Sequence, residues 1–361
     1  MSQADPHIKE MAAHISRHLG LHFSPRQGEA LSRSLKVAAG GLGIDSRPEA
    51  MIAWLSQPEL ALHELDMLAQ HLTIGETYFF REKTALKLFS SLLPHESRKR
   101  ANGQRPRLRI WSAGCSSGEE PYSLAILLQR HLHDLKDWDI QITATDISPA
   151  ALAKARSGRY TRWSFRETPE DIKHEYFRAE DGHWIIREDI REMVHFARLN
   201  LSTGNYPSLA TQTHEMDIIF CRNVLMYLSP ESVVRATDRF LQALRPGGYL
   251  ITSQVELNEI WFSAYKRMVF ENGIFYQKPL HNESKEKKSV LLPDSEVPEV
   301  SPAVKRRVIR TSSSPSAQAS VRRPKTLSRT AVSTGVKSEA VVSDKGEDLH
   351  QKARKLADQG C

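Results

Sequence analysis

The stretch Leu108–Leu128 reads LRIWSAGCSSGEEPYSLAILL, and the rest of the chain is organised around it. An apolar run enters a turn of small residues, which continues through two glutamates and Pro121 into a segment with helical spacing of apolar residues. Gly114 and Gly118 let the backbone turn sharply and approach a ligand, and Pro121 suits the first turn of a helix. The stretch predicts a strand, a loop and a helix whose free N–H groups could hold a nucleotide-like ligand. A plain strand-to-helix turn is the alternative.

The composition indicates a globular protein of about two domains. The 361 residues are 40% hydrophobic, and the start of the chain lacks the pattern of a signal peptide. No run approaches the roughly 20 apolar residues of a membrane span. Most of the net charge of +7 falls in residues 283–345, so it does not indicate a nucleic-acid partner for the folded part. We expect a soluble, cytoplasmic protein without membrane insertion.

Neither the cysteines nor the histidines predict a metal site. Cys115, Cys221 and Cys361 are too scattered for a disulfide framework or a paired-cysteine metal motif. We interpret the first two as packing residues, with redox sensing as the alternative. The three histidines between residues 14 and 22 could share a helix face, but no carboxylate or cysteine partner stands close in sequence.

Residues 5–72 show apolar residues at spacings of three and four in three segments. Gly40-Gly41, Pro48 and Pro58 are interpreted as helix breakers between them. The pattern predicts a small helical domain, which we place within residues 1–85.

Residues Thr77–Glu82 follow and read TYFFRE. We interpret Phe79 and Phe80 as an aromatic plug that packs the small domain onto the large one. Thr77 and Arg81 stand at i and i+4 and could both face a ligand. Arg81 would offer a rigid planar fork suited to a carboxylate.

The second domain, expected over residues 86–280, alternates strands and helices. A strand Ile140–Thr145 ends on Asp146, where ribose hydroxyls bind in a doubly wound sheet. Helix capping is the alternative role for this carboxylate, with Ser148-Pro149 competing for it. Met216–Cys221 reads as a buried central strand, and Arg222-Asn223 emerges at its carboxyl end, where such sheets carry their chemistry.

Three further elements complete the predicted domain. A strand over Met193–Leu201 places Asn200 where it could touch a base edge. Asp181-Gly182 predicts a hairpin inside an insertion over residues 159–196, and strands near Met268–Phe270 and Ile274–Gln277 predict a closing hairpin.

From about residue 281 the apolar pattern ends. Residues 281–345 are rich in Ser, Pro, Lys and Arg, which predicts a disordered basic linker. Residues 346–361 turn helical and look like the opening helix of a tetratricopeptide repeat. One helix cannot bury its own face, so we expect that a repeat domain is missing from this chain; a plain amphipathic terminal helix is the alternative.

These elements predict an α/β fold with a Rossmann-like, doubly wound sheet that binds a sulfonium cofactor. A dinucleotide-binding dehydrogenase is the competing interpretation. The loop lacks the G-x-G-x-x-G pattern, however, and Asp146 comes about 30 residues after the loop instead of the roughly 20 expected.

Four motifs in order resemble the chemotaxis receptor glutamate O-methyltransferases, the CheR family. They are TYFFRE (Thr77–Glu82), WSAGCSSGEEPYS (Trp111–Ser123), ATDIS (Ala144–Ser148) and IFCRNVLMY (Ile219–Tyr227). The resemblance implies a class I S-adenosylmethionine-dependent methyltransferase. Such an enzyme converts glutamate carboxylates on the cytoplasmic coiled coil of a methyl-accepting chemoreceptor into methyl esters, and releases S-adenosylhomocysteine.

The resemblance also implies the site residues. The expected cofactor contacts are Thr77, Arg81, Glu119, Asp146, Asn200, Leu201, Arg222 and Asn223, to which the loop argument adds Gly114. Arg81 and Tyr227 are the expected catalytic residues, nearest to the reaction. Gly75 departs from the family pattern, in which an asparagine is usual.

The chemistry agrees with this set. A glutamate carboxylate, with a pKa of about 4.3, is ionised at neutral pH, so methyl transfer needs no general base. Catalysis then reduces to positioning and desolvation, in which Arg81 and the Tyr227 hydroxyl can orient the carboxylate.

Two other functions stay open: a nucleic-acid methyltransferase, and a cofactor-binding scaffold of a chemosensory complex. The resemblance implies that the insertion contacts the receptor. The turn at Asp181-Gly182 is shorter than in members that tether to a receptor peptide, which favours a tether-independent enzyme. The linker and repeat start resemble methyltransferases of specialised chemosensory systems, including the Wsp type, and could bind a protein partner. A monomer is expected.

Overall fold

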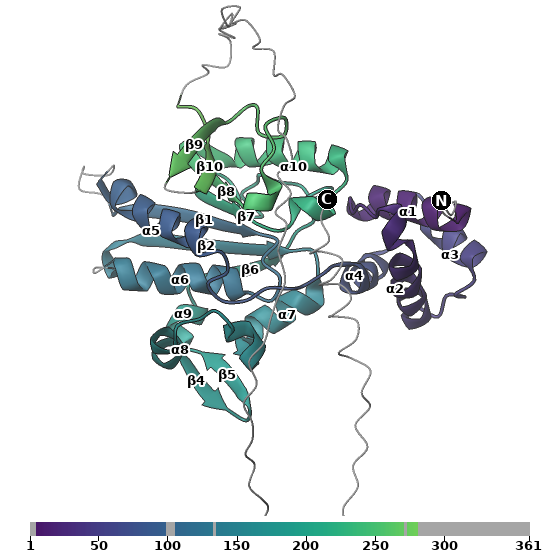
Figure 1. Ribbon diagram of the computed structural model, residues 1–361, viewed down its shortest axis with the longest axis horizontal. Coiled ribbons are helices and arrows are strands. Elements are labelled where there is room, and N and C mark those ends of the chain that lie inside the picture. The colour runs from purple at the N-terminus through teal and green to yellow at the C-terminus, as the bar shows by residue number, and fades with distance from the viewer. Residues whose placement is uncertain (1–4, 99–104, 133–134, 271–272, 281–361) are drawn as a thin grey trace, which may run out of the picture. The chain divides into compact units, whose positions relative to one another are not determined.

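A seven-stranded sheet with the order β6-β2-β1-β7-β8-β10-β9 forms the centre of the molecule (Figure 1). Its strands are β1 (Arg107–Ala113), β2 (Asp139–Asp146), β6 (Val194–Arg198), β7 (Met216–Cys221), β8 (Leu244–Thr252), β9 (Lys266–Phe270) and β10 (Gly273–Gln277). The first five in this order pair in parallel. Strand β10 is antiparallel to both β8 and β9. The predicted doubly wound sheet and its closing hairpin are confirmed.

The computed structural model describes residues 5–98, 105–132, 135–270 and 273–280. All of them fall within one compact unit, Met1–Val290. Within these ranges no helix combines the length and apolar character needed to cross a membrane. The expected linker (281–345) and terminal helix (346–361) lie outside the described residues, and the proposed domain boundaries stay predictions.

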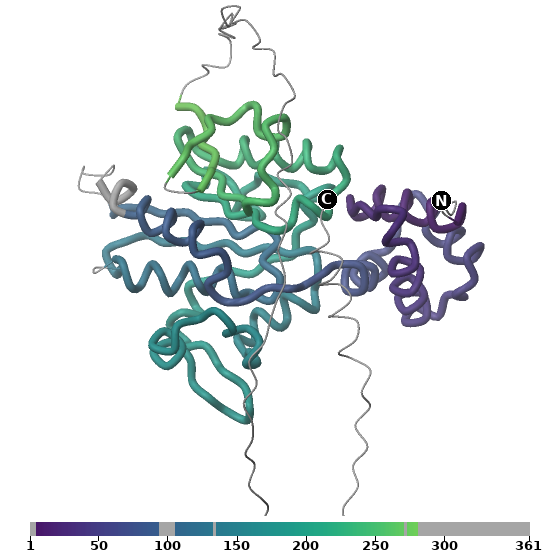
Figure 2. The backbone as a smooth tube through the Cα atoms, viewed as in Figure 1, coloured from purple at the N-terminus to yellow at the C-terminus, as the bar shows by residue number. Residues whose placement is uncertain are grey.

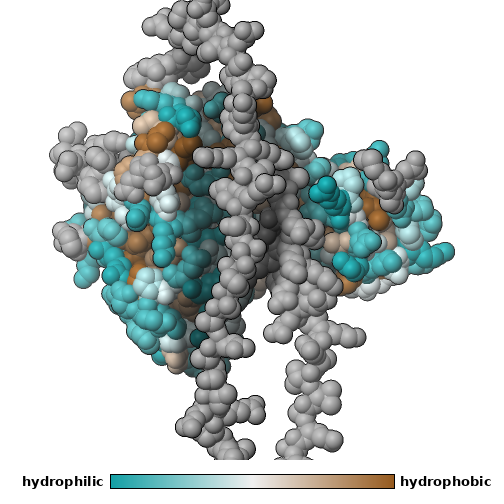
Figure 3. Space-filling view, in the orientation of Figure 1, coloured by the Kyte–Doolittle hydropathy of each residue, from teal (hydrophilic) through white to brown (hydrophobic). Residues whose placement is uncertain are grey.

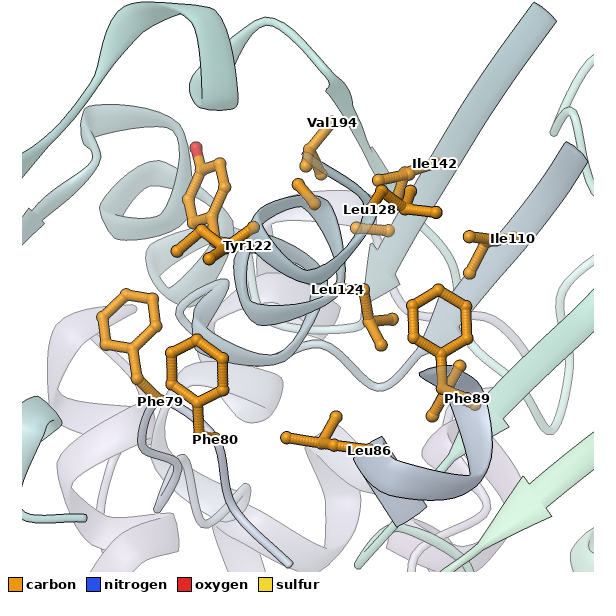
Figure 4. Packing of buried hydrophobic residues seen from close by; sticks show 14 of the residues in the cluster. Phe79, Phe80, Leu86, Phe89, Ile110, Tyr122, Leu124, Leu128, Ile142 and Val194 are labelled. Carbon is orange, nitrogen blue, oxygen red and sulfur yellow. The ribbon is translucent and has the colours of Figure 1, made fainter. Parts of the chain in front are cut away.

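Both faces of the sheet are covered, because alternate residues of a strand point to opposite faces. Ile110 and Phe220 belong to a cluster with α5 (Lys83–Arg98), α6 (Glu119–His131) and α7 (Pro149–Ser157). Figure 4 shows residues of this cluster around Leu124 and Phe89. The neighbouring residues on the same strands, such as Trp111 and Cys221, pack instead with α10 (Pro230–Ala243). The central strand β7 is therefore buried along its whole length, as predicted.

The helical part has its own core and four helices, one more than predicted. They are α1 (Pro6–Leu19), α2 (Gly28–Gly41), α3 (Pro48–Leu55) and α4 (Leu62–Leu72), drawn in purple and blue in Figure 2. Met11, Leu35, Trp54 and Leu68 are buried together in this core. The helix that the prediction missed is α3: Pro48 follows the break after α2, as expected, but also occupies the first turn of α3, where a missing N–H costs no hydrogen bond.

The insertion forms a small antiparallel sheet with the order β3-β5-β4. Its elements are β3 (Arg159–Tyr160), η3 (Arg162–Phe165), α8 (Glu170–Tyr176), β4 (Phe177–Glu180), β5 (His183–Ile186) and α9 (Glu188–Arg191). Asp181 and Gly182 form the turn between β4 and β5, both with positive φ (48° and 74°). The predicted hairpin is confirmed, since a two-residue turn of this kind favours Asp-Gly.

The aromatic plug packs differently from the prediction. The Phe79 ring lies 4.8–5.0 Å from the rings of Tyr160, Phe165 and Phe177, all in the insertion. Phe80 joins the core under α5 and α6. Phe79 and Phe80 thus anchor the segment after α4 to the insertion and to the core against the sheet. They do not belong to the core of the helical part.

Exposed hydrophobic side chains gather near the antiparallel edge of the sheet. Val255, Ile260 and Val269 are 72%, 81% and 66% exposed. In Figure 3 one of several brown, hydrophobic patches lies over the region where Figure 1 places β9 and β10, while the insertion is mostly hydrophilic.

Candidate active site

A cavity of about 400 Å³ opens at the carboxyl ends of the parallel strands. The loops after β1, β2, β6 and β7 line it, together with residues 72–78 and Arg81 of the segment after α4. From the helical part, Leu19, Leu21–Phe23 and Gln27 also line it, together with Gln70 of α4. Sites at the carboxyl edge of an α/β sheet bind ligands where the strand order reverses, here between β1 and β7. The volume falls within the usual range for small-molecule sites.

The loop after β1 depends on Gly114. Its φ is +81°, and a Cβ atom at this position would lie 2.4 Å from Cγ2 of Val224. The N–H groups of Gly114 and Cys115 both donate to the carbonyl of Thr145, at 2.7 and 2.9 Å. The loop is thus folded back onto β2, with its glycine against the loop that follows β7.

Asp146 lies at the end of β2 with its carboxylate in the cavity wall. Its two oxygens accept from the N–H groups of Ser116 (2.8 Å) and Ser148 (2.9 Å). Ser148, and not Asp146, caps α7 by accepting from the N–H of Ala151, so the capping alternative is wrong. Burial raises the pKa of Asp146, and the backbone donors oppose that shift. The carboxylate is therefore held in one orientation and keeps acceptor capacity for a ligand.

The acid that lines the cavity is Glu120, whereas the predicted contact Glu119 is not among the lining residues. Glu119 is buried and accepts from the hydroxyls of Ser117 (2.7 Å) and Ser164 (3.0 Å). Consecutive residues of a helix point about 100° apart, so only one of the two glutamates turns toward the cavity. Glu120 lines it and accepts from Ser112 Oγ at 2.7 Å. Burial raises the pKa of Glu120, and the charge of Arg222 opposes this.

Arg222 forms the back of the cavity and joins three segments. Its side chain is 3% exposed, and Nη1 donates to Glu120 Oε2 at 3.0 Å. Nη2 donates to the carbonyl of Arg81 at 2.6 Å and lies 3.4 Å from Glu82. Its Nε is buried without a hydrogen-bond partner among the described residues. Among the hydrogen-bond donors of this guanidinium, Nε is thus the one without a partner in the described residues.

Arg81 and Tyr227 both line the cavity. Arg81 Nη1 donates to the carbonyl of Glu76 at 3.0 Å, and its guanidinium lies 5.6 Å from the Tyr78 ring. Burial raises the pKa of Tyr227, although the charge of Arg81 opposes this shift. The Tyr227 hydroxyl therefore stays protonated and can donate a hydrogen bond at neutral pH.

The i, i+4 argument for Thr77 and Arg81 was wrong, although both residues line the cavity. The segment between α4 and α5 is irregular, and Phe80 and Glu82 have positive φ values of 60° and 56°. The chain reaches the cavity through these turns and not along a helix face.

The remaining predicted residues also lie in the wall: Asn200, Leu201 and Asn223. Asn200 accepts from the N–H of Ser202 at 2.8 Å and donates to the carbonyl of Leu19 at 3.3 Å. Its amide thus links the sheet to the helical part.

The helical part is joined to the segment that carries Tyr227. The N–H of His22 donates to the Tyr227 carbonyl at 2.8 Å, and the N–H of Ser229 donates to the Gly20 carbonyl at 2.8 Å. Leu21 and Leu228 form an antiparallel bridge. The sequence analysis missed this contribution; its one signal is Gly20, which ends α1 with φ +75°.

The two cysteines near the site are packing residues. Cys115 and Cys221 are buried, and burial raises the pKa of both thiols well above the usual value. A protonated, buried thiol reacts poorly, which argues against redox sensing. The part of the chain that the structure describes holds no group of three or more His, Cys, Asp or Glu residues arranged to bind a metal ion.

Comparisons with known proteins agree with this geometry. The family described as "CheR methyltransferase, SAM binding domain" matches residues 75–267. The chain is 34% identical over 283 residues to chemotaxis protein methyltransferase 1 of Pseudomonas aeruginosa, covering 77% of this chain and 99% of that protein. It is 36% identical over 226 residues to chemotaxis protein methyltransferase 2 of Vibrio cholerae, covering 62% and 76%.

Among solved structures, the chain is similar to the N-methyltransferase NodS of Bradyrhizobium japonicum in complex with S-adenosyl-L-homocysteine. The identity is 14%, the match covers 56% of this chain and 89% of that one, and the TM-score is 0.32.

Proposed function

This chain belongs to the CheR family of chemotaxis protein methyltransferases, and from that premise we propose that it converts glutamate side chains of a chemoreceptor into methyl esters. It is an S-adenosylmethionine-dependent protein methyltransferase with the Rossmann-like class I fold. The observation that carries the proposal is the single cavity in which the glycine loop, Asp146, Arg81 and Tyr227 meet.

The residues of the cavity fit this cofactor. The carboxylate of Asp146 suits the two ribose hydroxyls. Gly114 lets the loop beside it turn at φ +81° with Val224 packed against the glycine. When bound, S-adenosylmethionine supplies an electrophilic methyl group on a positively charged sulfur.

We assign the following residues to the site as a proposal. Cofactor contacts are Thr77, Arg81, Gly114, Glu120, Asp146, Asn200, Leu201, Arg222 and Asn223, with Glu120 in place of Glu119. Arg81 and Tyr227 are the catalytic residues.

Catalysis by this chain is positioning and exclusion of water. The substrate glutamate, with a pKa of about 4.3, arrives ionised, so no side chain has to accept a proton from it. The Arg81 guanidinium and the Tyr227 hydroxyl hold the two carboxylate oxygens, and removal of water leaves the anion a better nucleophile. Arg81 must not bind too tightly, since equal stabilisation of the ground state would not raise the rate.

The substrate in this proposal is the methyl-accepting coiled coil of a chemoreceptor, reached from the cytoplasm by a monomeric enzyme. The insertion contacts the receptor, and the two-residue turn at Asp181-Gly182 supports an enzyme that needs no receptor tether peptide. A further protein partner would bind the linker and repeat region.

The test combines cofactor binding with product analysis. Calorimetric titration with S-adenosylhomocysteine should show saturable binding that is lost in Asp146→Ala. Asp139→Ala, at the exposed opposite end of the same strand, is the matched control and should bind as wild type does.

Purified receptor cytoplasmic fragment and methyl-labelled S-adenosylmethionine then test the reaction. Labelled methanol released by mild base identifies a carboxyl methyl ester. A folded chain that binds S-adenosylhomocysteine but labels no receptor would overturn the enzymatic proposal and leave the scaffold function.

A further inference from the structure

A buried carboxylate lies behind the segment that carries Tyr227. Glu256 ends η5 (Gln254–Glu256), the short helix after β8, and is 2% exposed. Its Oε2 accepts from the N–H of Asn223 at 2.7 Å, and its Oε1 accepts from the N–H of Val224, also at 2.7 Å. The N–H of Met226 points to the same Oε1 at 3.4 Å. One side chain thus holds the backbone of the whole turn after β7.

The turn needs such a partner because it leaves the sheet abruptly. Asn223 has φ +56°, a left-handed conformation that few residues other than glycine adopt. A buried backbone N–H without an acceptor is strongly unfavourable. The position of Val224 also sets that of Tyr227, whose N–H donates to the Val224 carbonyl at 3.1 Å.

Local helix capping explains only two of the five hydrogen bonds that Glu256 accepts. Ser253 and Glu256 form a capping box at the start of η5, in which Oε2 accepts from the Ser253 N–H (3.2 Å) and hydroxyl (2.6 Å). The bonds of Oε1 go instead to Val224 and Met226, some 30 residues away in sequence. A cap would need one oxygen, whereas this side chain uses both.

We propose that Glu256 is a positioning residue for methyl transfer, because it fixes the turn Asn223–Tyr227 so that Asn223 and Tyr227 face the cavity. The inference rests on the proposed function for the role of Tyr227, but the hydrogen bonds stand independently of it. Glu256 acts through the backbone of the turn and not on the substrate.

Both oxygens of the carboxylate are required, since only N–H and O–H donors face them. Glutamine at this position has the same shape but a single acceptor oxygen. Its NH₂ group would point at backbone N–H donors and leave either Asn223 or Val224 without an acceptor.

The test uses four variants of the full chain. Glu256→Gln removes one acceptor, and Glu256→Asp keeps both on a shorter stem. Ser253→Ala breaks only the local cap. Glu259→Gln makes the same chemical change on an exposed residue three positions away. Two quantities are measured: hydrogen–deuterium exchange of the peptide covering residues 222–228, and steady-state receptor methylation.

Glu256→Gln should speed exchange in residues 222–228 and lower kcat by about 10- to 100-fold, with the KM for receptor nearly unchanged. Glu256→Asp should recover part of the lost turnover, and Ser253→Ala and Glu259→Gln should behave as wild type. Unchanged exchange in Glu256→Gln, or an equal effect of Ser253→Ala, would overturn the proposal. If the wild-type chain methylated no receptor, the proposed function would fail while the exchange data still decided the role of Glu256 in the turn.

Discussion

Replacing Arg222 by methionine should be the most damaging single change in the cavity wall. Methionine fills a similar volume but has no charge and no donor. The change removes the bonds to Glu120 (3.0 Å) and to the Arg81 carbonyl (2.6 Å), and the ion pair with Glu82 (3.4 Å). Glu120 stays behind as a largely buried carboxylate, 14% exposed, that keeps only its bond from Ser112 among the described residues.

The magnitude follows from this geometry. Removing one partner of a buried ion pair costs about 3–5 kcal/mol, because the remaining charge is left in a poorly solvating environment. The Glu82 pair adds little, since the Glu82 side chain is 29% exposed and screened by water. We therefore expect Arg222→Met to lower the free energy of unfolding by about 3–5 kcal/mol, a large fraction of the stability of a typical domain.

Denaturant unfolding of four chains measures this: wild type, Arg222→Met, Glu120→Gln and the double variant. Arg222→Met leaves the Glu120 carboxylate without its ion-pair partner, and Glu120→Gln removes that charge. The double variant should therefore be more stable than the sum of the two single losses predicts. Strict additivity, or a loss below about 1 kcal/mol in Arg222→Met, would refute the view that a desolvated ion pair holds the wall together.

Three further outcomes are expected. Gly114→Ala should lose about 1–3 kcal/mol of stability, because alanine is strained at φ +81° and its Cβ would lie 2.4 Å from Val224. Denaturant unfolding measures the loss of stability, and S-adenosylhomocysteine titration measures the effect on binding. Wild-type values in both experiments would contradict the loop geometry. Tyr227→Phe should lower kcat by about 10-fold or more while S-adenosylhomocysteine binds as before, whereas normal turnover would remove Tyr227 from the reaction. Glu120 has a pKa raised by burial, so its protonated form favours the folded state: its stability contribution is present below the ordinary pKa of 4.5 and is lost as pH rises through the folded value. Unfolding of Glu120→Gln from pH 4 to 8 should therefore depend less on pH than that of wild type, and parallel curves would contradict this.

Local patterns predicted the elements that depend on local chemistry. The apolar run at β7, Pro230 at the start of α10 and Asp181-Gly182 between β4 and β5 each determine a structure within a few residues. The carboxyl ends of the strands then had to meet at one edge of the sheet, which brought Asp146 and Asn223 together.

The prediction failed where local sequence allows two side-chain positions equally well and only tertiary packing selects one of them. Glu119 and Glu120 are both plausible at the start of α6. In the structure Glu119 is the buried one, and it accepts from Ser117 in the loop and from Ser164 in the distant insertion. Phe79 was expected to pack the helical part onto the sheet domain, but its ring packs against three aromatic rings of the insertion. Gly20 marks the end of α1, but a helix end does not say that the residues after it pair with a distant turn.

The bridge between Leu21 and Leu228 limits how freely this enzyme can be recombined with its relatives. A chimera that takes only the helices from another family member would place foreign residues against Tyr227 and Ser229, whose backbones bond to His22 and Gly20. Steric crowding at Gly20 adds a second constraint on such a chimera, because a Cβ atom at this position would lie 2.2 Å from the Ser202 side chain. The helices and the turn after β7 therefore have to be exchanged together in such a chimera, although some two hundred residues separate them in the chain.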